Sequence, residues 1–222
     1  MKWMVSLVAV VVLLVIIIIA FTRHATKERT PALLLFFALL IYHIGDCGLW
    51  YGYDYELTRR IASVGFYFIM PWSLWLMYVL TPAEKMNYFI RIVTLLLMIP
   101  WVYALVMIDS SPLVFLEEMM PAPDEAYETF VMGLVFVFVL GALFAAIVGF
   151  RASHLRNDYG KRLARYFSWG LIIYTLLILC LFMSIDLFRY DATWWFGVPS
   201  TLYALLVLLG LRCCCCEEKA EG

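Results

Sequence analysis

Charged residues are scarce in this chain. They make up 15% of its 222 residues, whereas 65% of the residues are apolar. A water-soluble domain is about half apolar and about one quarter charged, so this composition excludes a soluble enzyme fold and indicates a membrane protein. The charges also nearly cancel, at a net −1, which leaves no basic surface for binding nucleic acid.

Histidine and lysine are few, and their positions exclude two kinds of chemistry known in seven-span proteins. With the orientation that the positive charges favour, His24 and His154 face the cytoplasm and His43 lies near the outer face, so the three cannot hold a catalytic zinc together. None of the five lysines lies inside an apolar stretch, which excludes a retinal Schiff base. No phosphate-binding loop or nucleophile elbow occurs. We expect no catalytic residues, no metal and no cofactor.

Long apolar runs dominate the chain instead. A helix needs about 20 residues to cross a hydrocarbon core about 30 Å thick, and the runs lack the two-residue alternation of a membrane barrel. The sequence therefore predicts an all-α polytopic membrane protein, with a seven-helix transmembrane bundle over residues 1–212 and a short tail over 213–222. The spans are predicted at about 3–22, 32–50, 61–80, 89–108, 129–150, 166–185 and 194–211.

The distribution of Lys and Arg predicts the orientation of these spans. Of the 16 basic residues, 12 fall on one side of the predicted membrane and four on the other. Because short cytoplasmic loops carry the excess of positive charge, we expect the N-terminus outside the cell, the C-terminus in the cytoplasm, and a multi-pass protein of the plasma or inner membrane. A cleaved signal peptide over residues 1–22 is disfavoured, because cleavage would move the basic connections outside.

The second predicted span carries the best candidate ligand site. His43 and Asp46 are three residues apart and share a helix face, and Asp186 and Arg189 lie at the same outer end of the sixth span. Ionisable groups inside a membrane are costly and usually functional, so these four residues are predicted to bind a small ligand or cation. The alternative is a purely structural pair, either Asp46 with Arg189 or His43 with Asp46.

Two groups of residues on the cytoplasmic side are candidates for other contacts. The basic connection 151–165 contains Arg156, Lys161, Arg162 and Arg165, which we expect to contact a cytoplasmic protein. After Arg212 come four consecutive cysteines, Cys213, Cys214, Cys215 and Cys216. Their place at the membrane favours acylation, while a plain interfacial tail and a metal site remain alternatives.

Small residues mark one face of the fifth predicted span. Gly141, Ala145 and Gly149 recur every four residues, and Gly133 precedes them. Such a row lets two helix backbones approach closely in lipid. We expect it to pack against a helix of the same chain, with a second copy of the chain as the alternative.

The order of these elements resembles a known sensing region. The second span reads TPALLLFFALLIYHIGDCGLW, the third reads RRIASVGFYFIMPWSLWLMYVL with a proline near its middle, an acidic connection precedes span five, and the basic segment RASHLRNDYGKRLARY precedes span six. From about Pro31 to Arg212 this pattern is similar to the seven-helix N-terminal sensing region of prokaryotic histidine kinases and diguanylate cyclases. The resemblance implies a module that binds a small ligand or senses the envelope. The kinase or cyclase of that family would follow span seven and is missing here, so a signal must pass to a separate protein.

We therefore expect a non-catalytic, sensor-like membrane module, with the bilayer and other membrane or cytoplasmic proteins as partners. The alternative is a structural subunit that packs into a larger membrane assembly. A small-solute transporter is disfavoured, because many transporters contain an internal repeat and the sequence of spans one to three is not repeated in spans five to seven.

Overall fold

The computed structural model describes residues 2–23, 26–82, 88–106, 125–154, 158–188 and 195–211, and throughout these ranges the only long elements are α-helices. Within them, the side chains of residues 2, 50, 56, 104–106, 125–132, 134, 158–159 and 182–188 are not described. The prediction of an all-α protein is confirmed. The helices are α1 (Lys2–Thr22), α2 (Arg29–Tyr51), α3 (Tyr55–Leu80), α4 (Tyr88–Val106), α5 (Glu125–Ser153), α6 (Asp158–Phe188) and α7 (Gly197–Gly210).

Five of these helices, α1, α2, α3, α5 and α6, are long and apolar enough to cross a membrane. Helices α4 and α7 are apolar, but their apolar stretches are shorter. The 14 residues of α7 rise about 21 Å, less than a hydrocarbon core of about 30 Å, so α7 is shorter than the predicted span 194–211. Pro199 lies in the first turn of α7, where a helix tolerates the missing N–H. The chain is a helical membrane protein with several spans.

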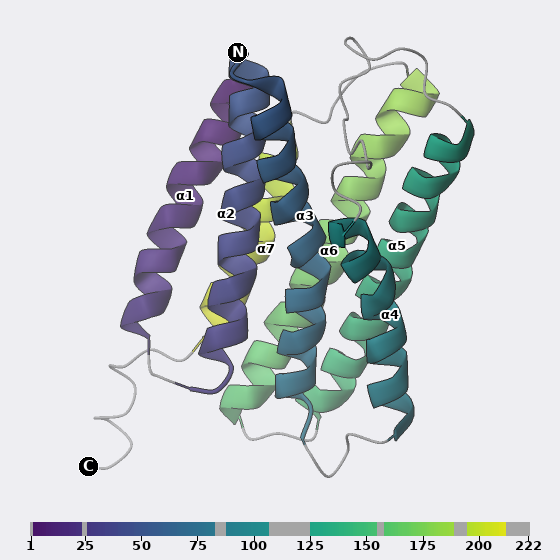
Figure 1. Ribbon diagram of the computed structural model, residues 1–222. Helices are drawn as coiled ribbons and strands as arrows, with labels where there is room; N and C mark the ends of the chain where they lie inside the picture. Colours follow the sequence, from purple (N-terminus) through teal and green to yellow (C-terminus); the bar gives the residue numbers. More distant parts are fainter. Residues whose placement is uncertain are drawn as a thin grey trace.

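Successive helices alternate in direction around the bundle (Figure 1). We call the end where α1 begins and α2 ends the upper end, and the end where α1 ends and α6 begins the lower end. The start of α1 and the end of α7 lie at opposite ends of the bundle. Helix α7 lies behind α2 and α3 in this view and packs against α1, α2 and α6.

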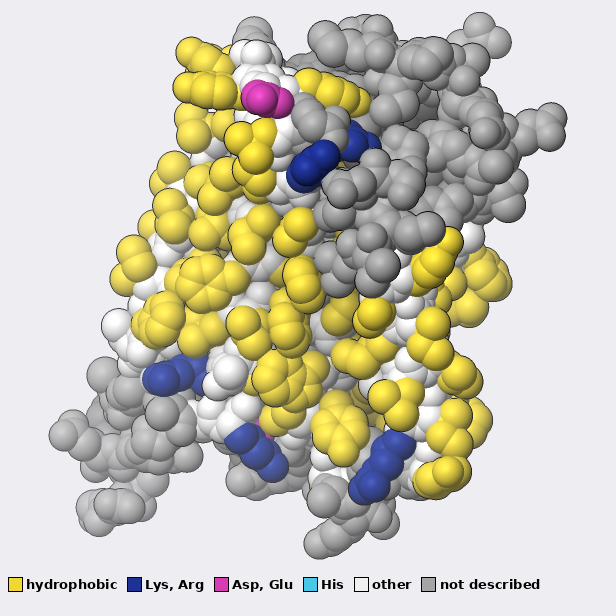
Figure 2. All heavy atoms as spheres, in the orientation of Figure 1, with side chains coloured by type: hydrophobic (Ala, Val, Ile, Leu, Met, Phe, Trp, Pro, Cys, Tyr) yellow, Lys and Arg dark blue, Asp and Glu magenta, His cyan; other side chains and the backbone are white. Residues whose placement is uncertain are grey.

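The surface between the two ends is apolar. Figure 2 shows hydrophobic side chains over the middle of one face, with Lys and Arg side chains near the lower end and a smaller group near the upper end. On α1, Val8 is 61% and Ile18 is 64% exposed. Soluble monomers rarely expose apolar patches of more than a few hundred Å², so this belt faces lipid rather than water.

Helices α2 and α3 form the tightest pair in the bundle, and glycines cause it. A Cβ atom added to Gly45 of α2 would lie 2.7 Å from the Cα atom of Ala62, and one added to Gly65 of α3 would lie 2.6 Å from the Cα atom of Tyr42. The two backbones are therefore in direct contact. Small residues supply this close packing in membranes, where lipid offers no hydrophobic drive for helix association. Sequence reasoning overlooked these glycines.

The small residues singled out on α5 have different surroundings from one another. Gly141 faces Met70 of α3, whose Sδ atom would lie 3.2 Å from a Cβ atom added to this glycine, and Gly149 faces Phe167 and Ser168 of α6. Ala145 is fully buried, whereas Gly133 is exposed and, among the described residues, has no neighbour within 4 Å of the position of an added Cβ atom. Gly141 and Gly149 therefore pack against other helices of the same chain, and Gly133 takes no part in this packing.

A short turn joins α2 to α3 at the upper end. Gly52 ends α2 with φ of 85°, a left-handed conformation that glycine adopts without strain, and its N–H donates to the Gly48 and Leu49 carbonyls. The Asp54 side chain accepts the Leu57 N–H at 3.1 Å and caps α3. This cap lets α3 begin at Tyr55, six residues before the predicted span.

The basic segment 151–165 is mostly helical rather than a loop, which corrects the sequence prediction. Helix α5 continues to Ser153 and α6 begins at Asp158, so the connection is only residues 154–157. Lys161, Arg162 and Arg165 lie on the first turns of α6. The predicted sixth span was limited to the apolar stretch, because hydropathy falls where charged residues begin. Lys, Arg, Leu and Ala are nevertheless all good helix formers, so α6 extends beyond the apolar stretch.

Candidate functional site

The upper ends of α1 and α2 are joined by polar contacts around Asp46. The Ser6 hydroxyl of α1 donates a hydrogen bond to Asp46 Oδ2, and the Cys47 thiol lies 3.9 Å from the Trp3 carbonyl oxygen. Ser6 is fully buried and Asp46 is half-buried. Ser6 was not predicted as a site residue, although it is the only polar residue between Trp3 and Phe21. A lone hydroxyl in an apolar run is the signal that identifies it.

His43 lies one helical turn below Asp46 and is completely buried. Within the described part of the chain, neither its Nδ1 nor its Nε2 atom has a hydrogen-bond partner. The imidazole contacts the ring of the neighbouring Tyr42 edge to face, with centroids 4.8 Å apart. A buried polar group without a partner costs about 1–3 kcal/mol, so burying the His43 ring in this state lowers the free energy of unfolding.

Three buried hydroxyls within the helices do not carry this cost. The hydroxyls of Ser73, Thr94 and Thr175 donate to the carbonyls four residues earlier, at Ile69, Ile90 and Leu171, over 2.7–2.8 Å. Serine and threonine commonly satisfy themselves in this way within helices. His43 differs from these three residues, and it shares the lack of a partner among the described residues with the Trp101 Nε1 and Ser168 Oγ atoms.

Of the four predicted ligand-site residues, the structure places two together. His43 and Asp46 lie on the same side of α2, and α6 runs to the same upper end with Asp186 in its last turn. The Asp186 side chain and all of Arg189 lie outside the described residues, so their part in the site stays a prediction. The alternative of a His43–Asp46 hydrogen bond is wrong, because within the described residues neither imidazole nitrogen has a partner, and the Asp46 carboxylate accepts from Ser6.

A continuous series of aromatic contacts runs from this site toward the lower end. Each neighbouring pair of rings has centroids 5.2–6.4 Å apart, within the range of favourable aromatic pairs. The series crosses α2, α3, α5, α6 and α7. Its members are Tyr42, Phe66, Phe138, Tyr174, Tyr203 and Phe167. The Tyr203 hydroxyl is also 3.0 Å from that of Ser73, which links α7 to α3.

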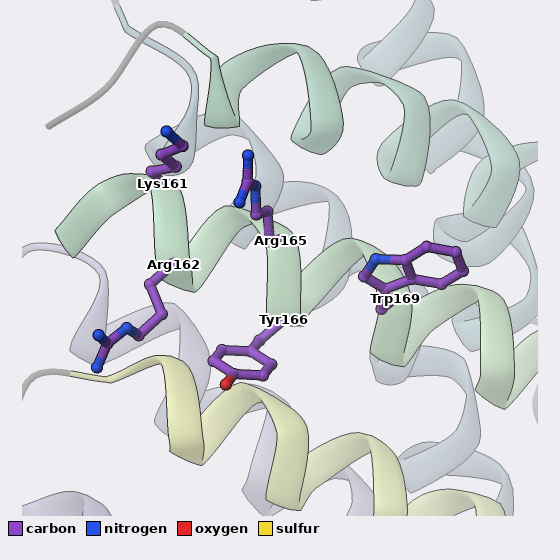
Figure 3. Close-up of a pocket in the computed structure, with 5 residues that line it drawn as sticks. All are labelled: Lys161, Arg162, Arg165, Tyr166 and Trp169. Atoms are coloured by element: carbon purple, nitrogen blue, oxygen red, sulfur yellow. The ribbon is translucent and has the colours of Figure 1, made fainter. Parts of the chain in front are cut away.

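A basic groove lies at the lower end, on the first turns of α6. Lys161, Arg162, Arg165, Tyr166 and Trp169 line an open cavity of about 580 Å³. Figure 3 shows Lys161 and Arg165 pointing to one side of the helix and Arg162 to the other. Three of the four predicted partner-binding residues are thus brought together, with two aromatic residues that the prediction did not include.

Several predicted residues lie outside the described ranges. These are Arg156, the four cysteines Cys213–Cys216 and His24, so acylation of the cysteines stays a prediction. Among the residues that are described, no group of three or more His, Cys, Asp or Glu side chains is arranged to hold a metal ion.

Comparison with known proteins adds no assignment. No family model matches the chain, and no match was found among curated proteins or solved structures. The similarity to the sensing region of histidine kinases and diguanylate cyclases therefore stays a prediction from the sequence pattern.

Proposed function

We propose that this chain is a non-catalytic membrane sensor module that binds a small polar ligand at the upper end of the bundle. The ligand site is formed around His43 and Asp46, and a separate protein receives the signal. In this proposal all seven helices cross the plasma or inner membrane and the upper end faces outside.

The state of His43 is the observation that carries the proposal. A neutral imidazole offers one hydrogen-bond donor and one acceptor, and both are unused in the described structure. A ligand that bonds to them recovers the cost of burying them. Asp46 adds an acceptor close by, so the site fits a small solute with donor groups, such as an ammonium or a hydroxyl.

Two features support transmission from this site to the lower end. Tyr42 is next to His43 in the chain, and its backbone touches Gly65 of α3, so a shift of α2 must displace α3. From Tyr42 the aromatic series reaches Phe167, two residues from Trp169 of the basic groove. Packed elements of this kind shift as units rather than deforming continuously.

The proposed orientation is supported by the charges that the structure describes. Eight basic residues lie at the lower end, whereas three, Lys2, Arg59 and Arg60, lie at the upper end. This asymmetry favours a cytoplasmic lower end. The eight are Arg23, Lys27, Arg29, Arg91, Arg151, Lys161, Arg162 and Arg165.

Tags at the two termini test the topology. In intact cells, a tag at the N-terminus is expected to react with a membrane-impermeant probe, whereas a tag at the C-terminus reacts only after permeabilisation. Labelling of both tags from the same side would contradict an odd number of spans and would remove the outer ligand site.

Substitutions at the ligand site test sensing. In lipid nanodiscs, a panel of small ammonium- and hydroxyl-bearing solutes is expected to raise the unfolding temperature of the wild type. His43→Leu should abolish this shift, while the free energy of unfolding without ligand stays level or rises by roughly 1–3 kcal/mol, since an unsatisfied polar group is removed. Asp46→Asn keeps an acceptor for Ser6 and should weaken the shift without unfolding the protein.

Asp54→Asn is the matched control, because Asn also caps helices and Asp54 lies at the same end of the bundle. Its ligand shift should equal that of the wild type. The sensor proposal fails if no solute shifts the unfolding temperature and the protein is isolated in mild detergent in a fixed ratio with other membrane proteins. That outcome supports the structural-subunit alternative.

A further inference from the structure

The basic groove on α6 has a chemical character that changes along its length. Among the residues whose side chains are described, its lining consists of three cations and two aromatic residues and includes no acidic side chain. Arg162, Arg165, Tyr166 and Trp169 are exposed, and Lys161 is partly exposed. The groove therefore offers concentrated positive charge at a place that other molecules can reach (Figure 3).

The three cations are not neutralised by the rest of the described structure. No hydrogen bond or ion pair joins Lys161, Arg162 or Arg165 to another residue whose side chain is described, in contrast to Arg29, which donates to the Arg23 carbonyl oxygen at 3.0 Å. An anion in the groove would provide a partner that these side chains do not have among the described residues.

The aromatic residues mark the depth at which this groove meets lipid. Trp169 is 55% exposed, and its ring is held edge to face against Phe150 of α5 with centroids 5.4 Å apart. Exposed Trp and Tyr side chains are enriched at the level of lipid headgroups. Trp169 thus places the groove at the membrane–water interface.

Beyond Trp169, the same stripe of α6 becomes apolar. Leu176 lies two turns further along this stripe and is 57% exposed. Arg165 and Leu176 are separated by about 16 Å along the helix axis, at 1.5 Å per residue. A molecule that follows this stripe must be anionic at one end and apolar at the other.

We infer that the groove binds the phosphate headgroup of an anionic phospholipid, with Lys161 and Arg165 at the phosphate, Arg162 adding positive charge on the other side of the helix, Trp169 at the glycerol level and an acyl chain along the stripe toward Leu176. Basic pockets beside transmembrane helices bind such headgroups on the cytoplasmic side of membranes. An acidic protein segment would match the cations but not the apolar continuation. This site is independent of the ligand site around His43.

Selective retention of lipid tests the inference. The protein is reconstituted in nanodiscs of equal phosphatidylglycerol and phosphatidylcholine and transferred to mild detergent, and the lipids that remain bound are counted by native mass spectrometry. The wild type is expected to retain phosphatidylglycerol over phosphatidylcholine by about tenfold or more. The triple variant Lys161→Gln, Arg162→Gln, Arg165→Gln should lose this preference, and Arg165→Gln alone should reduce it about fivefold.

The control removes the same charges elsewhere at the lower end. Lys27, Arg91 and Arg151 are exposed and lie outside the groove, so the triple variant Lys27→Gln, Arg91→Gln, Arg151→Gln should keep the preference. An equal loss in this control would show general attraction to acidic membranes and overturn the inference. Unchanged retention in Arg165→Gln would overturn it even if the groove triple variant fails to fold. Complete displacement of the lipid by inorganic phosphate or by a polyglutamate peptide would replace it with a phosphate or a protein site.

Discussion

Alanine at Gly45 or Gly65 is expected to lower the free energy of unfolding by about 3 kcal/mol or more, or to prevent folding. Overpacking a well-filled interior usually costs about 1–3 kcal/mol, and here the atoms in the way belong to backbone. The new methyl at Gly45 would lie 2.7 Å from both the Ala62 Cα atom and the Thr58 carbonyl oxygen. Relief therefore requires separating α2 from α3 along their length. Denaturant unfolding in mixed micelles measures the change.

Gly133→Ala is the matched control for this prediction. Gly133 is also helical, but it is exposed, and no described residue lies within 4 Å of the position that an added Cβ atom would take. Because Ala is a better helix former than Gly by about 1 kcal/mol, its stability should be unchanged or slightly raised. If Gly45→Ala and Gly133→Ala are equally stable, the direct contact between α2 and α3 is wrong.

Trp101→Ala is expected to cost about 3–5 kcal/mol, the range for removing a large buried aromatic side chain, and to release α4 from the bundle. Trp101 is completely buried, and its indole contacts Phe66 and Tyr67 of α3 and Phe138 of α5 with centroids 6.1–6.5 Å apart. Much of the remaining α4 surface faces outward, including Leu95 and Ile99. The measurement pairs denaturant unfolding with protease sensitivity of the segments flanking α4.

Trp101→Phe separates the role of the ring from that of the indole N–H. No hydrogen-bond partner for the Trp101 Nε1 atom exists in the described residues, so losing this group removes no bond. Phenylalanine should keep most of the stability and leave α4 attached. If alanine and phenylalanine are equally damaging, or if alanine is harmless, Trp101 does not anchor α4.

Apolar runs located the helices well where both ends of a helix lie near the edge of lipid, as in α1 and α2. The prediction was less accurate for α3 and α6, which begin with charged residues beyond the apolar run. Helix formation depends on capping and backbone hydrogen bonds as well as on hydropathy. Asp54 caps α3. The first turns of α6, around Lys161, are helical although they lie outside the apolar stretch that crosses lipid.

The candidate site was only partly predictable for a similar reason. Composition and spacing identified His43 and Asp46, because ionisable residues are rare within apolar runs. Their partners belong to other helices. Whether Asp46 meets Ser6, and whether His43 meets any polar atom, depends on which helix lies beside α2 and at what height. The spacing of residues along one helix does not show which other helix packs against it.

Composition and the lengths of the apolar runs were sufficient to establish an all-helical membrane protein, since lipid leaves the backbone few ways to satisfy its hydrogen bonds. The close contact of α2 with α3, the isolation of His43 and the groove on α6 were decided by tertiary structure. A glycine can equally be exposed to lipid or pressed against another backbone, as Gly133 and Gly45 show, and only the packing of the helices distinguishes the two.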